Sequence, residues 1–406
     1  MRRVAGTTAL AAVLVLFAGS GVAQALTPRD AALEAELDRR IEAPALGRDV
    51  TMAVEDVGTD EEMYDHFADE RQLPASTMKV VTAANALMNL GRGHRFVTRV
   101  VQGEQKDSII LVGGGDPLLT AADLRRLAQR TAAKLARADI TRVVLEVDDY
   151  LFPRPTEAQG WEPGDSPTYA SAVRPLGLLG EYSMNTAASA TALFADALNS
   201  QGISVRRAGR AVADGGAPTL AAVDEHTVGE AVALMLLISE NNVAEVLFRQ
   251  VALARGYPAT WSGSSAAAKE TLRELGLRTW DLELIDGSGL SMDDRVTARL
   301  LTDLLDRVVD PAWPALRPIR GWLPVAGSTG TLTRRFSAPP ADCARGKVFA
   351  KTGSLTGVST LAGLTRGPDG RWRSFAIMVN QRPESQPWTS TSQAIDTLAA
   401  TVNGCA

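Results

Sequence analysis

The chain has 406 residues, a formal net charge of −5, 45% hydrophobic residues and 22% charged residues. This length suits two domains, and the composition is typical of a globular protein rather than a disordered chain. The acidic balance argues against nucleic-acid binding, which needs a basic face. The three His and two Cys show none of the usual zinc-binding spacings. We therefore expect no nucleic-acid partner, no metal and no other cofactor.

The first 25 residues have the pattern of an export signal. Arg2 and Arg3 precede an apolar run at 9–17, and residues 23–25 (Ala-Gln-Ala) provide the small residues of a cleavage site. The alternative is a membrane anchor, but this run is much shorter than the span of about 20 residues that a bilayer requires. We expect removal of residues 1–25 and a mature protein in the periplasm, in the cell wall or outside the cell, where nucleotides are scarce.

Export also bears on Cys343 and Cys405, which are 62 positions apart. A disulfide is allowed in an oxidising compartment. In the chain-entropy account, closing a loop of this length stabilises the fold by about 4 kcal/mol. Two buried free thiols are the alternative, and we expect the disulfide.

In the first half of the chain, apolar runs predict strands separated by helices and turns. Strands are expected at 49–56, from about 61 to 67, at 108–112 and at 142–147, and a helix at 76–90. The stretch 152–169 contains four prolines and is expected to form a long loop. The Gly-rich run 113–116 lacks the Gly-Lys-Ser/Thr of a phosphate loop, so we interpret it as a turn and expect no nucleotide.

In the second half, Thr227 and Glu230 form a capping-box pattern that begins a helix running to about Ile238. Polar residues at 239–242 separate this helix from another that ends near Gly256. The remaining expected elements are a strand at 347–351 that is interrupted at 352–354, strands near 357–365 and 373–380 joined by a turn at 367–370, and a helix at 392–402. Strands at both ends of the chain suggest one sheet built from the N- and C-terminal parts.

Ser76 and Lys79 lie one helical turn apart, so their side chains are neighbours. A serine needs a base to become a good nucleophile. An amine can serve as that base when burial and nearby positive charge lower its pKa. Taken alone, this spacing is common by chance and marks a helix cap followed by a surface lysine.

Two further short motifs occur later in the chain, at 239–241 (Ser-Glu-Asn) and 351–353 (Lys-Thr-Gly). Alone, the first is an ordinary turn between helices and the second is a strand end with a solvated lysine. The rarity of lysine in this chain favours a functional role for the three motifs over these ordinary interpretations. Only six of the 42 basic residues are lysines, and two of the six, Lys79 and Lys351, lie in the motifs. Unlike arginine, a buried lysine can lose its proton, which is what a general base requires.

The three motifs in this order resemble those of the penicillin-recognising serine enzymes, the D-alanyl-D-alanine peptidases and serine β-lactamases. The resemblance implies that Ser76 is the acylated nucleophile and Lys79 its base. Ser239 and Asn241 would transfer protons and hold the substrate amide. The substrate-binding residues it implies are Lys351 and Thr352 for the terminal carboxylate, Gly353 for close backbone approach, and the backbone N–H groups of Ser76 and Ser354 for the oxyanion.

Ser76 and Ser239 are separated by 163 positions, which leaves room for an inserted domain. This organisation resembles the low-molecular-mass class C penicillin-binding proteins, which form peptidase family S13. Segments 93–96, 113–117, 286–291 and 351–358 also match that family. The resemblance implies an α+β fold in which a penicillin-binding-protein/β-lactamase-like domain, with an antiparallel sheet flanked by helices, carries an inserted α/β domain. We expect the catalytic domain to comprise residues 26–95 and 225–406, and the insert residues 96–224.

The activity implied is a serine-type D-alanyl-D-alanine carboxypeptidase, with possible endopeptidase activity, that acts on peptidoglycan stem peptides and binds β-lactam antibiotics covalently. One alternative is a serine β-lactamase, but the deacylating Glu pattern or middle-motif Tyr of those enzymes is absent. The other is a catalytically silent cell-wall binding protein, which would not need an intact Ser76 and Lys79. No Gly-x-Ser-x-Gly elbow is present, so an α/β-hydrolase is not expected.

The family resemblance also concerns the third residue of the stem peptide. It implies that Asp148 and Phe152 hold a diaminopimelate side chain, the first by accepting from its ammonium and the second by packing on its methylene stem. The alternative is a strand-end Asp and a core Phe. The family's Arg and Gln positions are occupied here by Met292 and Thr356, so a cation for a free carboxylate is missing unless Arg295 supplies it.

Overall fold

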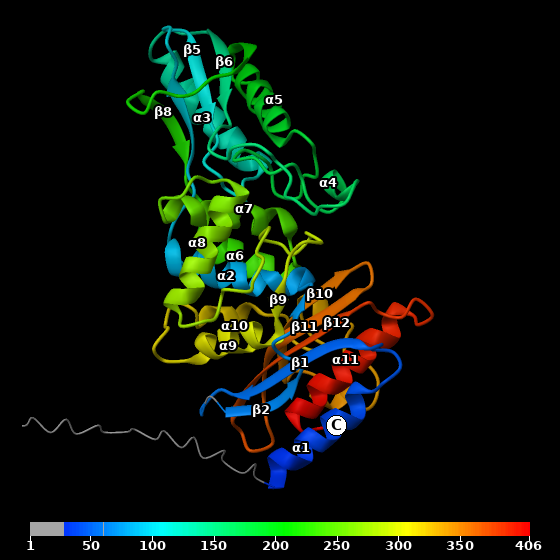
Figure 1. The fold of residues 1–406 in the computed structure, drawn as a ribbon. Helices are drawn as coiled ribbons and strands as arrows, with labels where there is room; N and C mark the ends of the chain where they lie inside the picture. Colours follow the sequence, from blue (N-terminus) through cyan, green and yellow to red (C-terminus); the bar gives the residue numbers. More distant parts are fainter. Residues whose placement is uncertain (1–27, 60) are drawn as a thin grey trace, which may run out of the picture.

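The computed structural model describes residues 28–59 and 61–406, so the predicted export signal at 1–25 lies outside the described residues. Within those two ranges, no helix is long and apolar enough to cross a membrane. The described residues form two five-stranded sheets with a layer of helices between them, and a small two-stranded sheet. Helices α1 and α11 lie at the end farthest from the second five-stranded sheet (Figure 1).

The main sheet has five antiparallel strands, and both ends of the chain contribute to it, as expected. Their order is β10 (Val348–Leu355), β11 (Val358–Arg366), β12 (Trp372–Asn380), β1 (Asp49–Asp56) and β2 (Glu61–His66). The tight turn at 367–370 joins β11 to β12. Strand β10 therefore lies at an edge of this sheet. Residues 324–326 pair with its first part, through the N–H of Ala326 to the oxygen of Val348 and the N–H of Ala350 to the oxygen of Pro324.

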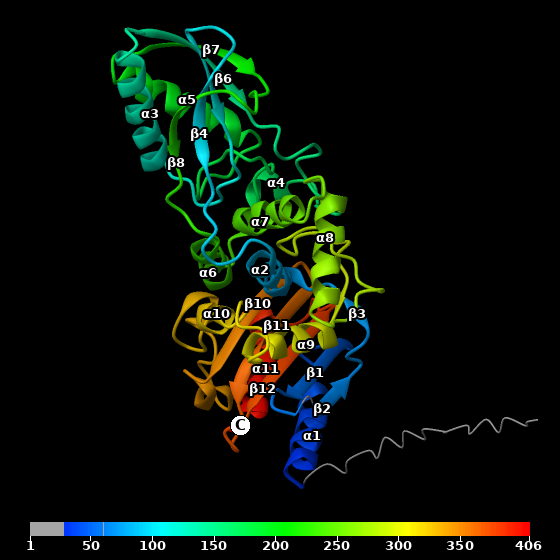
Figure 2. The ribbon, with the colours of Figure 1, turned by 90° about the vertical axis from the view of Figure 1, so that its left-hand side faces the viewer.

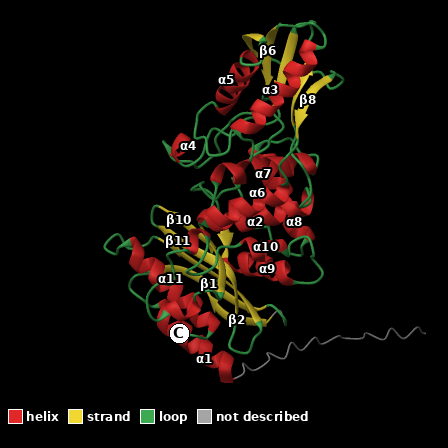
Figure 3. Cartoon of the chain, turned by 180° about the vertical axis from the view of Figure 1, so that it is seen from behind, coloured by secondary structure: helices red, strands yellow, loops and turns green. Residues whose placement is uncertain are grey.

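Helices cover both faces of this sheet. The side chains of its central strands are therefore buried on both sides. Helices α1 (Pro28–Ile41) and α11 (Trp388–Asn403) cover one face, and α9 (Ala298–Val309) covers the other (Figure 3). In β1, Val50, Met52 and Val54 belong to the core under α1 and α11, whereas Ala53 belongs to the core on the α9 side. The period of two in a strand thus divides its side chains between two cores.

The helical layer beside the main sheet surrounds α2 (Met78–Asn89), in which ten residues are buried. Its other members are α6 (Val228–Ile238), α7 (Asn241–Ala254), α8 (Trp261–Glu274) and α10 (Pro318–Trp322). Thr227 and Glu230 form the predicted capping box at the start of α6. The short elements near the main sheet and these helices are η1 (Ala75–Thr77), η2 (Gly330–Leu332), η3 (Ala341–Ala344), and the paired strands β3 (Arg71–Gln72) and β9 (Val296–Thr297).

The second sheet stands apart from the first (Figure 2). Its order is β7 (Ser204–Arg210), β6 (Arg142–Asp148), β5 (Ser108–Val112), β4 (Thr98–Gln102) and β8 (Thr219–Val223), with β5, β6 and β7 parallel. Helices α3 (Ala121–Ala136) and α5 (Thr186–Asn199) pack on it around a core of their own. This separate core supports our proposal that residues 96–224 form an inserted domain. The proline-rich stretch 152–169 is a loop with one short helix, α4 (Asp165–Thr168).

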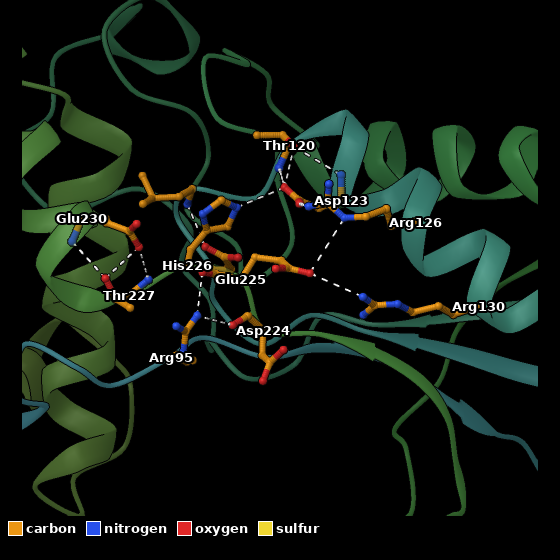
Figure 4. A network of polar contacts seen from close by, with 12 residues as sticks. Arg95, Thr120, Asp123, Arg126, Arg130, Asp224, Glu225, His226, Thr227 and Glu230 are labelled. Carbon is orange, nitrogen blue, oxygen red and sulfur yellow. Dashed lines mark hydrogen bonds and ion pairs between the residues drawn. The ribbon is translucent and has the colours of Figure 1, made fainter.

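The two connections between the sheets run side by side through a polar network (Figure 4). Arg95, on the first connection, donates to the backbone oxygens of Asp224 and Glu225 on the second, at 3.0 and 2.7 Å. His226 Nε2 lies 3.1 Å from Oδ2 of Asp123, in the first turn of α3. Because both connections are tied to each other and to α3, the inserted part is held at a defined orientation.

Candidate active site

Ser76 lies in the short turn η1, immediately before α2, and its side chain is partly exposed. The preceding Ala75 has a positive φ of 46°, a strained conformation for a residue other than glycine. Lys79, one turn later, is completely buried. Its amine lies 2.9 Å from Ser76 Oγ, 2.7 Å from Asn241 Oδ1 and 2.8 Å from the backbone oxygen of Ser288. The first two motifs are therefore brought together as predicted.

The second motif lies between α6 and α7. Ser239 ends α6 in the left-handed conformation, with φ of 63°, and Glu240 caps α7 by accepting from the N–H of Val243. This sharp reversal directs the hydroxyl of Ser239 toward Lys351 Nζ, which lies 2.9 Å away. The amide of Asn241 donates to the backbone oxygen of Tyr169, at 2.9 Å, in the inserted part.

The third motif differs from the sequence prediction in one respect. Thr352, Gly353 and Ser354 do not interrupt the strand, because β10 continues to Leu355 and pairs with β11 along its whole length. A Cβ on Gly353 would lie 2.8 Å from the backbone oxygen of Pro74 and 3.0 Å from the nitrogen of Ser76. A glycine is required here because only it lets the edge strand approach the nucleophile so closely.

Burial controls the charge of both lysines. It lowers the pKa of Lys79 from 10.5 to about 8, although Glu245, Asp286, Glu240 and Asp294 act in the opposite direction. This is the direction that a base requires, and burial is its main cause. The pKa of Lys351 falls well below its ordinary value, through burial and then through the charge of Lys79. A neutral amine is thus accessible near physiological pH.

Carboxylates behind Lys79 were not identified from the sequence. Both oxygens of the buried Glu245 accept from the N–H groups of Gly287 and Ser288, each at 2.9 Å. Burial raises the pKa of Glu245 to about 8. The sequence marks segment 286–291 only by its resemblance to the family, and no sequence pattern connects it with a glutamate on α7. Among the described residues, no group of His, Cys, Asp and Glu is arranged to hold a metal ion.

Two cavities meet at Ser76. The larger, of about 720 Å³, also contains Ser239 and Thr352 and extends toward Trp388 at the start of α11. The smaller, of about 330 Å³, contains Asn241 and lies on the side of the inserted part. Its further lining residues are Glu162, Asp165, Tyr169, Gly289, Leu290, Met292, Ser354, Leu355 and Thr356. The Met292 and Thr356 positions singled out from the sequence therefore do lie beside the nucleophile.

Asp148 and Phe152 are not brought to this site. Asp148 Oδ1 accepts from the N–H of Tyr150, and its Oδ2 accepts from that of Ala213. Phe152 is only 4% exposed and packs with Val173 and other apolar side chains. Neither is among the described residues that line the two cavities at Ser76. Both residues therefore match the alternative interpretation, a strand-end Asp and a core Phe. The acidic and aromatic side chains that line the smaller cavity are instead Glu162, Asp165 and Tyr169.

The chain is similar to known proteins over most of its length. The chain is 34% identical over 376 residues to Carboxypeptidase Rv3627c of Mycobacterium tuberculosis, covering 88% of this chain and 81% of the relative. It is 31% identical over 475 residues to the D-alanyl-D-alanine carboxypeptidase of Actinomadura sp. strain R39, covering 92% of this chain and 86% of the relative. Penicillin-binding protein 4 from Haemophilus influenzae has the same fold, with a TM-score of 0.78, 22% identity, and coverage of 91% of this chain and 99% of that chain.

A family profile also matches most of the chain. The profile described as the D-Ala-D-Ala carboxypeptidase 3 (S13) family aligns with residues 33–180 and 178–402. The match spans both sheets and all three motifs of the site. The chain therefore belongs to the D-Ala-D-Ala carboxypeptidase 3 (S13) family.

Proposed function

We propose that the protein is a serine-type D-alanyl-D-alanine carboxypeptidase that acts on peptidoglycan stem peptides through an acyl-enzyme on Ser76. The observation that carries the proposal is the surroundings of Lys79 Nζ. Two of its three neighbours, Asn241 Oδ1 and the oxygen of Ser288, can only accept hydrogen bonds. They take the two N–H bonds of a neutral amine, and the lone pair is left facing Ser76 Oγ.

Acylation follows from this arrangement. Ser76 Oγ attacks the carbonyl carbon of the penultimate D-alanine while its proton passes to Lys79 Nζ. The edge position of β10 leaves the N–H of Ser354 free to pair with the N–H of Ser76 as an oxyanion hole, and Gly353 lets the two approach. The C–N bond then breaks, and the leaving amine of the terminal D-alanine takes up a proton.

The second lysine–serine pair, Lys351 and Ser239, acts on the terminal D-alanine, which is the leaving group. Lys351 Nζ contacts Ser239 Oγ, and Thr352 Oγ1 lies 2.8 Å from Thr331 Oγ1 at the rim of the larger cavity. Lys351 and the Thr352 hydroxyl bind the terminal carboxylate, and Ser239 relays the proton to the leaving nitrogen. Water then hydrolyses the ester, with Lys79 again as the base. A β-lactam follows the same first step and remains attached.

The smaller cavity takes the acyl side of the substrate, including the side chain of the third stem residue. Glu162 and Asp165 supply acidic groups for an ammonium, and Tyr169 supplies a ring for its methylene stem. No described Lys or Arg lines this cavity, and the Arg295 guanidinium is turned to the backbone oxygens of Met292 and Asp294. A side chain with a free amine and no free carboxylate therefore suits it best. We propose that the protein acts on these substrates outside the cytoplasm, and the pattern of an export signal at 1–25 supports this location.

Release of D-alanine from a synthetic stem pentapeptide tests the proposal. The wild-type protein should release one D-alanine per peptide, and Ser76→Ala should release none while unfolding at the same temperature. Ser200→Ala, which alters an exposed serine far from the motifs in sequence, is the matched control and should retain full activity. Equal release by Ser76→Ala and the wild type would contradict the proposal.

A further inference from the structure

The loop of the inserted part docks directly behind the catalytic lysine. Trp161 Nε1 donates to Asp286 Oδ2 at 2.8 Å, and the N–H of Met292 donates to the oxygen of Gly160 at 2.9 Å. Ser291 Oγ donates to the oxygen of Gln159 at 2.8 Å. Three consecutive residues of the loop thus contact the 286–292 segment of the catalytic part.

The fit between these two segments is close. Gly160 has a φ of 77°, and a Cβ at this position would lie 2.5 Å from Ser291 Oγ. On the other side of the 286–292 segment, a Cβ on Gly289 would lie 1.9 Å from the oxygen of Ala75, the residue before the nucleophile. The segment is therefore enclosed between the inserted loop and the turn that carries Ser76, with no space to shift.

Asp286 determines the shape of the enclosed segment. It is completely buried, and its Oδ1 accepts from the N–H groups of Ser288 and Gly289, at 3.1 and 2.7 Å. Its Oδ2 accepts from the N–H of Ser291 and from the Trp161 indole, both at 2.8 Å. These charge-assisted hydrogen bonds fix the backbone around Asp286. The N–H of Gly289 belongs to the same peptide group as the Ser288 carbonyl, so Asp286 also orients that carbonyl. The Ser288 carbonyl is the one that accepts from Lys79 Nζ.

The same loop also holds the second acceptor of Lys79. Asn241 presents Oδ1 to the lysine, and its amide nitrogen is fixed by the backbone oxygen of Tyr169. Both acceptors that orient the amine are therefore supported from residues 159–169, which also supply one wall of the smaller cavity.

We propose that Trp161 and Asp286 are positioning residues, through which the inserted loop fixes the Ser288 carbonyl and thereby the orientation of the Lys79 amine. The inference rests on the proposed function, because it concerns the base that activates Ser76. It means that the catalytic site is incomplete without the inserted part, although every residue of the three motifs lies outside that part.

Trp161→Phe tests the proposal, because it keeps a ring in the apolar cluster and removes only the indole donor. The second-order rate constant for acylation by a labelled penicillin should fall roughly tenfold at the pH optimum, the size expected for losing a hydrogen bond to a buried charge. The apparent pKa of the acylation rate should also fall. The charged groups that face Lys79 from the elements around it are Glu240, Glu245, Asp286, Asp294 and Lys351.

The direction of this pKa change separates positioning from general loosening. Without the indole, the Ser288 carbonyl is displaced and no longer stabilises an ammonium on Lys79. The loss of this acceptor lowers the pKa of Lys79. General loosening would instead admit water around Lys79 and raise its pKa from about 8 toward the ordinary value of 10.5.

Trp261→Phe is the matched control. Its ring lies 6.1 Å from that of Trp161, but its indole donates to the backbone oxygen of Pro155, away from Lys79. It should change acylation by less than twofold and leave the pH profile unchanged. If Trp161→Phe does not fold, Asp286→Asn is measured in its place and should show the same slower acylation at its own pH optimum. Its apparent pKa does not test the inference, because loss of the Asp286 charge alone lowers the pKa of Lys79.

An unchanged rate in a folded Trp161→Phe protein, a rise in its apparent pKa, or an equal loss in Trp261→Phe would overturn the inference. These outcomes leave the proposed function intact as long as the wild type is acylated at Ser76. Absence of acylation in the wild type would contradict the proposed function itself.

Discussion

Lys351 Nζ lies 2.9 Å from Ser239 Oγ. The separation is the same as that between Lys79 Nζ and Ser76 Oγ, so the site contains two lysine–serine pairs with different surroundings. Lys79 is surrounded by buried carboxylates, which keep its pKa near 8, whereas the charge of Lys79 further lowers the pKa of Lys351. The two pairs therefore differ in their electrostatic surroundings although their geometry is alike.

The pH dependence of acylation should report the pKa of Lys79. Only the neutral amine accepts the Ser76 proton, so the rate should rise with pH and level off above a midpoint of about 8. At pH 6, two units below that midpoint, the rate should be roughly a hundredth of the plateau. Stopped-flow acylation by a chromogenic penicillin between pH 5 and 10 measures this curve. A flat profile across this range would argue against a lysine base.

Lys79→Arg should nearly abolish acylation, by about a thousandfold or more, and leave the fold intact. An arginine stays protonated at any working pH and cannot accept the serine proton. Acylation is followed with a labelled penicillin and folding by thermal unfolding. Lys134→Arg, an exposed position on α3, is the control and should behave as the wild type. Retention of near-normal acylation by Lys79→Arg would remove this residue from the role of base.

The sequence predicted the motifs better than their surroundings. The capping box at Thr227, the strands at both chain ends and the Cys343–Cys405 disulfide are all confirmed. Each depends on local spacing or on very few possible partners. The interruption predicted at 352–354 was wrong, because pairing with β11 keeps Gly353 in the strand, and that pairing is tertiary.

The residues around the motifs were harder to predict for a physical reason. Asp148 followed a strand and fitted a binding role, but backbone N–H groups of Tyr150 and Ala213 already occupy its oxygens. Sequence patterns do not show which donors a loop will supply. The contact of Trp161 with Asp286 joins residues 125 positions apart through a loop without periodicity, so no local signal identifies it.

The disulfide between Cys343 and Cys405 ties η3, just before β10, to the chain end after α11, with the two Cα atoms 5.9 Å apart. The variant carrying Cys343→Ser and Cys405→Ser should lose about 2–4 kcal/mol of unfolding free energy. Penicillin labelling should fail at a lower temperature than in the wild type, because the cross-link lies beside the strand that bears Lys351. Denaturant unfolding measures the first effect. Mass spectrometry that finds two free thiols in the exported protein would exclude the bond.

Selectivity for the third stem residue should reflect the absence of a cation from the smaller cavity. Peptides with diaminopimelate, its amidated form or lysine should have kcat/KM values within about tenfold of one another, or ~1.4 kcal/mol. Met292→Arg should introduce a preference for the free carboxylate of roughly tenfold by supplying a charged hydrogen-bond donor. Met184→Arg, an exposed methionine that does not line this cavity, is the control. A strong wild-type preference for free diaminopimelate would show that another cation reaches the site.

The most direct test of the central claim is the mass of the protein after exposure to benzylpenicillin, followed by mapping of the modified peptide. The account predicts one adduct per chain, located on Ser76, that persists for many minutes after the free drug is removed and is absent from Ser76→Ala. An adduct on another residue, a chain that stays unmodified, or an adduct that disappears within seconds as the drug is turned over would contradict it.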